Sequence, residues 1–213
     1  MLRTILLLTA FLGALPSFAT EYTFEVEELQ QIVKDSVAMR DAGQMNAYEQ
    51  VDYIRNTLAQ KHPGKINMHP KWMYNETAGT LGQIQILYCT PHEYMAIFGS
   101  SVGTDGHSGR YGMDVWDIMM SGEMWAASQG QLEKEVYKAG ETAILPQGKA
   151  KAYKIPEYGY MLDYGRGNVI GVLQQGVVFP AIFVNQDFSS MKEQLGECGK
   201  SMISNWWQNL KPH

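Results

Sequence analysis

The chain has 213 residues, enough for one domain with a sizeable core. Charged residues make up 18% of it, below the roughly 25% typical of soluble domains, and 13 methionines enrich the apolar fraction. The formal net charge is −5 and no basic stripe is visible, so we expect no nucleic-acid partner. Much of the apolar surplus must therefore face a core, a ligand or a membrane.

Residues 1–20 have the layout of a secretory signal peptide. Arg3 supplies the positive charge, an apolar run extends from Ile5 to Leu15, and residues 17–19 form a small-x-small cleavage motif. The run of about 11 residues is shorter than the ~20 that a spanning helix needs, which favours a cleaved leader over a short membrane anchor. We expect export to a bacterial periplasm or to the lumen of the endoplasmic reticulum.

Apolar residues then recur at helical spacing in two stretches, at Val26, Leu29, Ile32, Val33 and Val37 and at Ala47, Val51, Ile54 and Leu58. Gly43 and the breaker at 62–64 are placed to end the two helices. We expect these helices to cap the rest of the molecule.

After Thr80 the pattern shortens, and glycines or prolines interrupt it every eight to twelve residues, which is typical of a compact all-β body. Ile84, Ile86 and Tyr88 alternate with their neighbours in the first strand. The further strand candidates are residues 93–98, 113–120, 133–138, 141–145, 149–154, 159–164 and 168–173.

The segment 140–148 has the acidic turn and Pro-x-Gly spacing of a cupin barrel's second motif. In metal cupins a histidine follows that glycine by three residues, but here the position is Lys151. The other motif's paired histidines are also missing, since His107 stands alone, so we expect no metal and no other cofactor. The segment favours a mainly β, jelly-roll-type barrel.

The C-terminal stretch returns to helical spacing, with one apolar stripe formed by Phe188, Met191, Leu195, Cys198, Met202 and Trp206. Trp206 and Trp207 beside Lys211 suit a membrane interface. Packing of the helix on its own barrel, or on a neighbouring subunit, explains the stripe equally well. The expected parts are a leader at 1–19, a helical segment at 20–65, a cupin-like barrel at 66–178 and C-terminal amphipathic helices at 179–213.

Two aspartates occur on apolar strand faces. Asp117 has the same parity as Val115 and Met119, and Asp163 has the same parity as Met161. An isolated ionised carboxylate in an apolar interior is unfavourable by several kcal/mol, so hydrogen bonding, proton sharing or a cationic ligand is expected. Two carboxylates that share one proton form a natural acid/base pair.

Other interpretations stay open at this point. Each aspartate could instead cap a turn or pair with Arg110 or Arg166. Tyr94 could orient a carboxylate or only fill the core, and His107 could carry protons or only hydrogen-bond within its Gly/Ser turn.

The two cysteines, Cys89 and Cys198, are too few and too far apart to predict a disulfide framework or a zinc site. Only folded geometry could bring them together. Asn75-Glu76-Thr77 would be a glycosylation site only in the endoplasmic reticulum.

Several blocks, in this order, resemble the family of fungal Δ8-Δ7 sterol isomerases and the sigma non-opioid receptor. They are LAQKHPGKI at 58–66, residues 92–122 from HEYMAIFG to DVWDIMMSG, YKAGETAILPQGKA at 137–150, YMLDYGRG at 160–167 and NQDF at 185–188. The resemblance covers roughly residues 22 to 205.

The resemblance implies a cupin-like barrel, usually in a homotrimer, with C-terminal helices against a membrane and a ligand entering from that side. Its two facing acids match Asp117 and Asp163, and the tyrosine that supports them matches Tyr94. Phe98 and Val115 match pocket-lining positions, and Ile84, Ile86 and Leu173 complete the expected ligand-binding set.

The implied activity is a cofactor-free shift of a ring double bond from Δ8 to Δ7 in a sterol or related polycyclic lipid, with Asp117 and Asp163 as the catalytic pair. The position of Asp163 is usually glutamate in the family. The alternative function is a non-catalytic, sigma-receptor-like binder of hydrophobic amines or lipids, or an accessory subunit of a membrane complex. A purely structural barrel, filled by its own side chains, is a third possibility.

Overall fold

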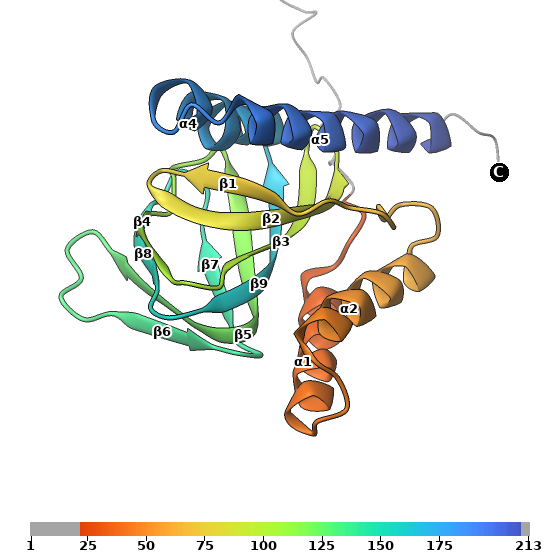
Figure 1. Ribbon diagram of the computed structural model, residues 1–213, viewed down its shortest axis with the longest axis horizontal. Helices are drawn as coiled ribbons and strands as arrows, with labels where there is room; N and C mark the ends of the chain where they lie inside the picture. Colours follow the sequence, from red (N-terminus) through yellow and green to blue (C-terminus); the bar gives the residue numbers. More distant parts are fainter. Residues whose placement is uncertain (1–21, 210–213) are drawn as a thin grey trace, which may run out of the picture.

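The structure is a computed structural model that describes residues 22–209. The expected leader lies outside these residues. Within them, nine strands form one sheet that curls into a nearly closed barrel, with helices at its side and across one end (Figure 1). The prediction of a mainly β barrel is confirmed.

The strands are β1 (Met73–Thr77), β2 (Thr80–Cys89), β3 (Glu93–Ser100), β4 (Thr104–His107), β5 (Met113–Ser128), β6 (Glu135–Lys138), β7 (Thr142–Leu145), β8 (Lys151–Ile155) and β9 (Gly159–Gly167). Their order is β1-β2-β3-β9-β5-β8-β4, with β6 and β7 also paired to β5 and every pair antiparallel. Two bonds bring β4 back beside the β1–β2 hairpin: Leu81 N–H donates to Thr104 Oγ1 (2.9 Å) and His107 N–H to the Ala78 carbonyl (3.2 Å). The sheet therefore closes on itself and encloses a space.

One predicted strand is wrong and two strands were missed. Residues 168–173 were expected to be extended, but Val169–Leu173 form helix α3. Asn168 starts this helix, because its side chain accepts a hydrogen bond from Gly171 N–H at 3.0 Å. The missed strands are β1 and the short β4. The expected barrel range of 66–178 thus runs past the last strand, which ends at Gly167.

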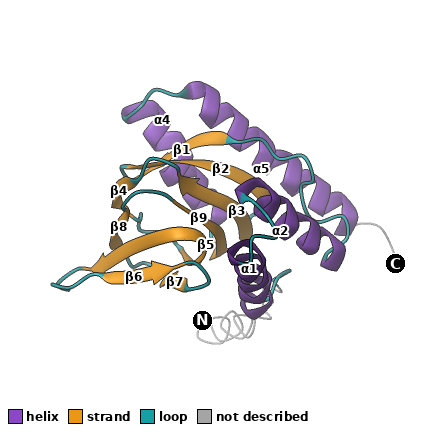
Figure 2. Cartoon of the chain, turned by 60° about the horizontal axis from the view of Figure 1, so that its bottom comes forward, coloured by secondary structure: helices purple, strands orange, loops and turns teal. Residues whose placement is uncertain are grey.

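Helices α1 (Val26–Asp41) and α2 (Ala47–Lys61) pack against the outside of the sheet (Figures 1 and 2). Asn46 caps α2 in a capping box with Glu49, and Gly43 allows the turn between the helices with φ of 71°. Their predicted apolar faces meet the even-numbered side chains of β5 and β9. This outer core contains Leu29, Ile32, Val33, Ile54, Leu58, Ile118, Met120, Leu162 and Tyr164.

The chain after β9 forms a lid across one end of the barrel. We use this name for residues 169–209, which comprise α3, the π-helical turn η1 (Gln174–Val178), α4 (Phe179–Phe183) and α5 (Phe188–Asn209). The long helix α5 lies over β1 and β2 in both views (Figures 1 and 2). Within residues 22–209, no helix combines the length and hydropathy of a membrane span.

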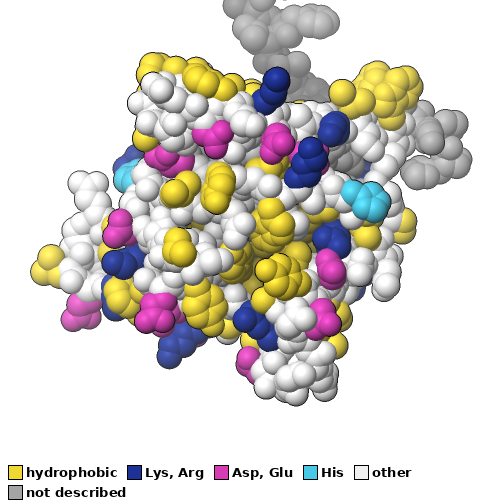
Figure 3. All heavy atoms as spheres, viewed as in Figure 1, with side chains coloured by type: hydrophobic (Ala, Val, Ile, Leu, Met, Phe, Trp, Pro, Cys, Tyr) yellow, Lys and Arg dark blue, Asp and Glu magenta, His cyan; other side chains and the backbone are white. Residues whose placement is uncertain are grey.

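The apolar stripe predicted on α5 does not pack on the barrel as a unit. Phe188 and Trp206, at its two ends, are 54% and 59% exposed, and Cys198 is its one fully buried member. The other buried residues of α5 are polar, namely Gln194, Glu197 and Asn205. Figure 3 shows hydrophobic side chains gathered over both ends of this helix.

Candidate active site

A cavity lies inside the barrel beneath the lid, and all eight site residues predicted from the sequence line it. They are Asp117, Asp163, Tyr94, Phe98, Val115, Ile84, Ile86 and Leu173. Leu173 does so from helix α3 and not from a strand. Apolar clusters lie at both ends of the cavity. The lid-side cluster includes Ile86, Val115 and Cys198, and the far cluster includes Phe98, Met119 and Met161.

Asp117 and Asp163 are direct partners across the antiparallel pair of β5 and β9. Residues opposite each other in such a pair point to the same face, with Cα atoms about 4.5–5.5 Å apart. Both side chains are half-buried, and both line the cavity. This register brings two short carboxylates together without the extra methylene of a glutamate.

Tyr94 fixes one of the two carboxylates. Its hydroxyl donates to Asp163 Oδ1 at 2.6 Å. Tyr94 lies on β3 opposite Gly165 of β9, and a Cβ atom on Gly165 would meet the tyrosine ring at 2.4 Å. Glycine at 165 therefore leaves the space that the ring needs to reach Asp163.

The pKa values of both aspartates are raised. Burial raises the pKa of Asp117 well above its usual range, the charge of Asp163 adds to this, and Lys151 opposes it. Burial also raises the pKa of Asp163 to about 7, although the Tyr94 hydrogen bond acts to lower it. A neighbouring pair of this kind holds one proton near neutral pH, as an acid beside a carboxylate.

The alternative pairings of the aspartates do not occur among the described residues. Arg110 donates to the Gly148 carbonyl at 2.6 Å. Arg166 donates to the Tyr164 hydroxyl at 2.8 Å and contacts Glu25, outside the barrel. Within residues 22–209, no cationic side chain is thus in direct contact with either carboxylate.

Other candidate positions have structural partners instead. His107, the last residue of β4, is exposed, and its Nδ1 accepts from Gly109 N–H at 3.0 Å, so its side chain holds the turn that follows the strand. Lys151, where metal cupins have histidine, forms an ion pair with Glu135 at 2.7 Å. Residues 22–209 contain no group of three or more histidine, cysteine, aspartate or glutamate side chains that could hold a metal ion.

Sequence reasoning missed several polar residues of the cavity wall. Asn75 and Thr77 were missed because β1 was not predicted, and Gln194 because the apolar stripe of α5 was taken as the informative face. Tyr153 lies on a predicted strand between Ala152 and Lys154, and the alternation of its aromatic ring with the charged Lys154 could have indicated an inward side chain.

Asn75 ties β1 to the lid. Its Nδ2 donates to the Gly176 carbonyl at 3.2 Å and to Gln194 Oε1 at 2.9 Å. Pro180, four residues after Gly176, has no N–H to donate to that carbonyl. Asn75 is 7% exposed, so the possible glycosylation motif is buried in this fold.

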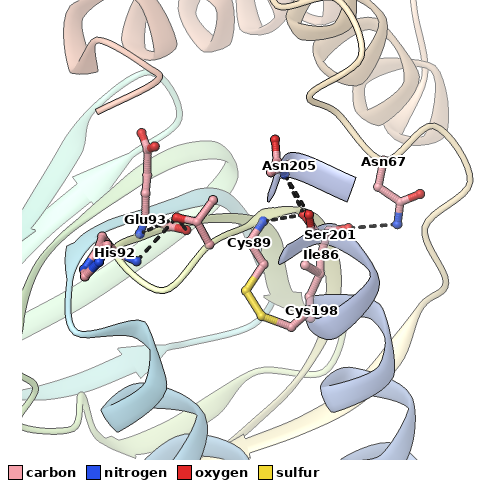
Figure 4. The surroundings of a disulfide bond; sticks show 9 residues. Asn67, Ile86, Cys89, His92, Glu93, Cys198, Ser201 and Asn205 are labelled. Atoms are coloured by element: carbon pink, nitrogen blue, oxygen red, sulfur yellow. Dashed lines mark hydrogen bonds between the residues drawn. A yellow bond between two sulfur atoms is a disulfide. The ribbon is translucent and has the colours of Figure 1, made fainter. Parts of the chain in front are cut away.

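A disulfide joins Cys89 of β2 to Cys198 of α5, and both cysteines line the cavity (Figure 4). The sequence did not predict this bond, because 109 residues separate the two positions. An irregularity between Ile86 and Tyr88 turns Cys89 to the cavity side, and Ser201 Oγ accepts from Cys89 N–H at 2.8 Å. The lid is therefore bonded covalently to the barrel rim.

Comparison with known proteins gives the family. The family model described as "ERG2 and Sigma1 receptor like protein" matches residues 1–210. The chain belongs to this family. The resemblance seen in the sequence blocks is confirmed.

Two relatives illustrate the range of the ERG2 and Sigma1 receptor like family. "C-8 sterol isomerase ERG2" of Gibberella zeae is 30% identical over 204 residues, with 93% of this chain and 85% of the relative covered. "Sigma non-opioid intracellular receptor 1" of Xenopus tropicalis is 28% identical, with 85% of this chain and 80% of the receptor covered. The family therefore includes proteins named as enzymes and proteins named as receptors.

Among solved structures, an RmlC-like cupin from Shewanella frigidimarina matches with a TM-score of 0.39 and 16% identity, covering 48% of this chain and 94% of the cupin. A cupin superfamily protein from Desulfitobacterium hafniense matches with a TM-score of 0.35 and 14% identity, covering 39% of this chain and 74% of that protein.

Proposed function

We propose that this protein is a sterol isomerase that moves a ring double bond from Δ8 to Δ7 in a sterol or related polycyclic lipid. The observation that carries the proposal is the direct pairing of Asp117 and Asp163 inside an apolar cavity, with Tyr94 bonded to one of them. Fungal relatives named C-8 sterol isomerase support the substrate class.

The pair divides the work of acid and base. Asp117, whose pKa is raised further by its charged neighbour, is the acid and protonates C9 of the C8=C9 bond, which leaves a cation at C8. Asp163, held by Tyr94, is the carboxylate that removes a proton from C7, and the C–H electron pair becomes the C7=C8 bond. The negative charge of Asp163 stabilises the cation in between. Asp163 then releases its proton to water and Asp117 takes one up from water, which restores the starting state.

Turnover of a Δ8 sterol by the purified protein tests this mechanism. In deuterated water the product should carry the Δ7 bond and one deuterium at C9, measured by mass spectrometry and NMR. Asp117→Asn and Asp163→Asn should each lower kcat by about 10²–10⁴-fold, the usual contribution of a positioned acid or base.

Asp114→Asn is the matched control, because Asp114 lies on the same strand and its carboxylate accepts from Gln147 N–H on an exposed segment. It should retain the wild-type rate. A wild type that is inert toward every Δ8 sterol, or an Asp117→Asn variant that keeps full activity, would contradict the enzymatic proposal.

The second candidate function is a non-catalytic binder of hydrophobic amines or lipids, or an accessory subunit of a membrane complex. It is favoured by the relative named as a sigma receptor and by the carboxylate facing an apolar cavity, since such a site attracts an ammonium group. Saturable binding of a hydrophobic amine, together with no turnover of any Δ8 sterol, would support this function over catalysis.

The protein is further proposed to lie on a membrane surface through its lid, as a homotrimer. Support for the membrane contact comes from exposed apolar side chains on α4 and α5, namely Phe179, Ile182, Phe183, Phe188, Ile203, Trp206 and Trp207. Support for the trimer is the family resemblance alone. Co-sedimentation with neutral lipid vesicles and light scattering in detergent test the two parts separately.

Export through the secretory route, to a bacterial periplasm or to the lumenal side of the endoplasmic reticulum, is also proposed. The leader pattern supports it, and so does the Cys89–Cys198 bond, because disulfides persist mainly in oxidising compartments. Fractionation of cells with a protease-accessibility assay would place the protein on one side of the membrane.

A further inference from the structure

Tyr153 of β8 carries a hydroxyl group in the cavity wall to which no role has been given above. Its ring is half-buried and lines the same cavity as the two aspartates. The hydroxyl donates only to the Met161 sulfur, at 3.5 Å. A thioether is a weak acceptor, so this phenol has not found the partner that a buried hydroxyl normally has.

Most of the other polar donors of the wall already have oxygen partners, and the Tyr111 hydroxyl interacts with Thr77. Tyr94 donates to Asp163, Asn75 donates to Gln194 and to a backbone carbonyl, and Ser108 donates to the Gly109 carbonyl. Among the described side chains that line the cavity, the Tyr153 hydroxyl is therefore the donor whose best acceptor is sulfur. A ligand oxygen can therefore replace the Met161 sulfur as its acceptor, and only a weak hydrogen bond is lost.

The position of this hydroxyl relative to the acid pair is set by β9. Met161 precedes Asp163 by two residues on the same face, a step of roughly 7 Å along a strand. Met161 belongs to the far cluster, whereas the end of β9 toward Gly167 leads into the lid. The cavity thus presents, from the lid inward, apolar side chains beside polar groups that bond to one another (Asn75, Thr77 and Gln194), then the carboxylates, then the Tyr153 hydroxyl.

A sterol has a complementary layout. Its one hydroxyl group lies on ring A, and two fused six-membered rings separate that oxygen from C8, about 6 Å for bonds near 1.5 Å. This is close to the step of roughly 7 Å along β9 from Met161, whose sulfur the Tyr153 hydroxyl contacts, to Asp163. With the hydroxyl at the far end, the C8=C9 bond lies beside the carboxylates and the hydrocarbon tail points toward the lid.

We propose that Tyr153 donates a hydrogen bond to the ring-A hydroxyl oxygen of the bound sterol and thereby fixes which ring bond faces Asp117 and Asp163. This inference rests on the proposed function. Tyr153 acts as a positioning residue, since the reacting carbons lie at the aspartates. Burial and the two nearby carboxylates raise the pKa of Tyr153 well above its usual value, which keeps the phenol protonated as a donor.

The test compares two ligands, a Δ8 sterol and its 3-deoxy analogue, on wild type and on Tyr153→Phe. Wild type should bind the hydroxylated sterol about 2- to 13-fold more tightly than the analogue, the usual range for one net hydrogen bond. Tyr153→Phe should lose that preference, with unchanged affinity for the analogue. Turnover by the variant should show a raised KM for the hydroxylated sterol and a mixture of double-bond positions.

Tyr137→Phe is the matched control. Tyr137 packs against the same far cluster, but its hydroxyl already donates to Glu135 at 2.6 Å. It should keep the wild-type preference. Binding of a hydrophobic amine to Tyr153→Phe, at wild-type affinity, shows that the cavity has kept its shape.

Two results would overturn the inference in different ways. If Tyr153→Phe weakens both sterols equally, or neither, the hydroxyl does not recognise the ring-A oxygen although sterol binding itself stands. If wild type binds no sterol, the proposed function fails first, and that is seen before any variant is made.

Discussion

Helices α1 and α5 both pack on the barrel, but α1 contacts it mainly with apolar side chains and α5 mainly with polar ones. Helix α1 buries Leu29, Ile32 and Val33 against the outside of the sheet, as its sequence pattern predicts. Helix α5 turns Gln194, Glu197 and Asn205 inward and leaves Ile203 and two tryptophans exposed.

The difference follows from what lies beneath each helix. Under α1 is the solid outer core, where burial of apolar area stabilises the fold. Under α5 is the rim of a cavity, where hydrogen bonds and a disulfide hold the helix and little apolar surface is covered. A lid fastened this way can cover a ligand while presenting an apolar outer face.

The largest stability effect is expected in the outer core. Leu29→Ala removes a side chain with no exposed surface and should lower the free energy of unfolding by about 2–5 kcal/mol, measured by urea denaturation. Ile203→Ala on α5, where the side chain is 60% exposed, should change it by less than about 0.5 kcal/mol. Equal losses of stability in the two variants would contradict the view that apolar burial holds α1 and does not hold α5.

Removal of the disulfide should act next most strongly, and mainly on the lid. The Cys89→Ser/Cys198→Ser double variant should lose about 2–4 kcal/mol of stability. Hydrogen exchange should rise in α5 before it rises in α1, because α1 keeps its apolar contacts. A reductant should have the same effect on wild type and no further effect on the variant. An equal rise of hydrogen exchange in both helices would contradict the idea that the disulfide holds the lid independently of α1.

Gln194→Leu should have a smaller effect of the same kind. The substitution removes the acceptor of the buried Asn75 amide and the donor to the Tyr74 carbonyl. The free energy of unfolding should fall by about 1–3 kcal/mol, measured by thermal or urea denaturation. The exposed neighbour Lys192→Ala is the control and should be neutral. A neutral Gln194→Leu variant would mean that these bonds do not hold the lid.

The smallest expected effect has the opposite sign and belongs to the cavity. An aspartate whose folded pKa is raised keeps its proton longer when folded, so stability falls as pH rises from about 4, the unfolded value, through about 7 for Asp163. Asp117→Asn replaces a carboxyl group whose pKa is raised on folding by a neutral amide and should raise Tm by about 2–4 °C at pH 8, roughly 1 kcal/mol. The gain should vanish near pH 4. A Tm below that of wild type at pH 8 would contradict the view that the pairing of Asp117 with Asp163 destabilises the fold.

Much of the fold was predictable because periodicity is local. The spacing of Leu29 and Ile54 with their neighbours gave two helices, and the parity of Asp117 with Val115 placed that carboxylate on an apolar face. The strand predicted at 168–173 was wrong because a short apolar run is compatible with both strand and helix. The Asn168 cap stabilises the helix.

The sequence by itself determined which faces of the strands and of α1 are apolar, and the family blocks indicated that Asp117 and Asp163 belong to one site. Only the tertiary structure decided that β5 and β9 pair in the register that sets these residues opposite each other, that Cys198 reaches Cys89, and that Tyr153 looks into the same cavity. The physical reason is range: backbone geometry repeats within a few residues, whereas register and closure depend on packing between segments far apart in the chain.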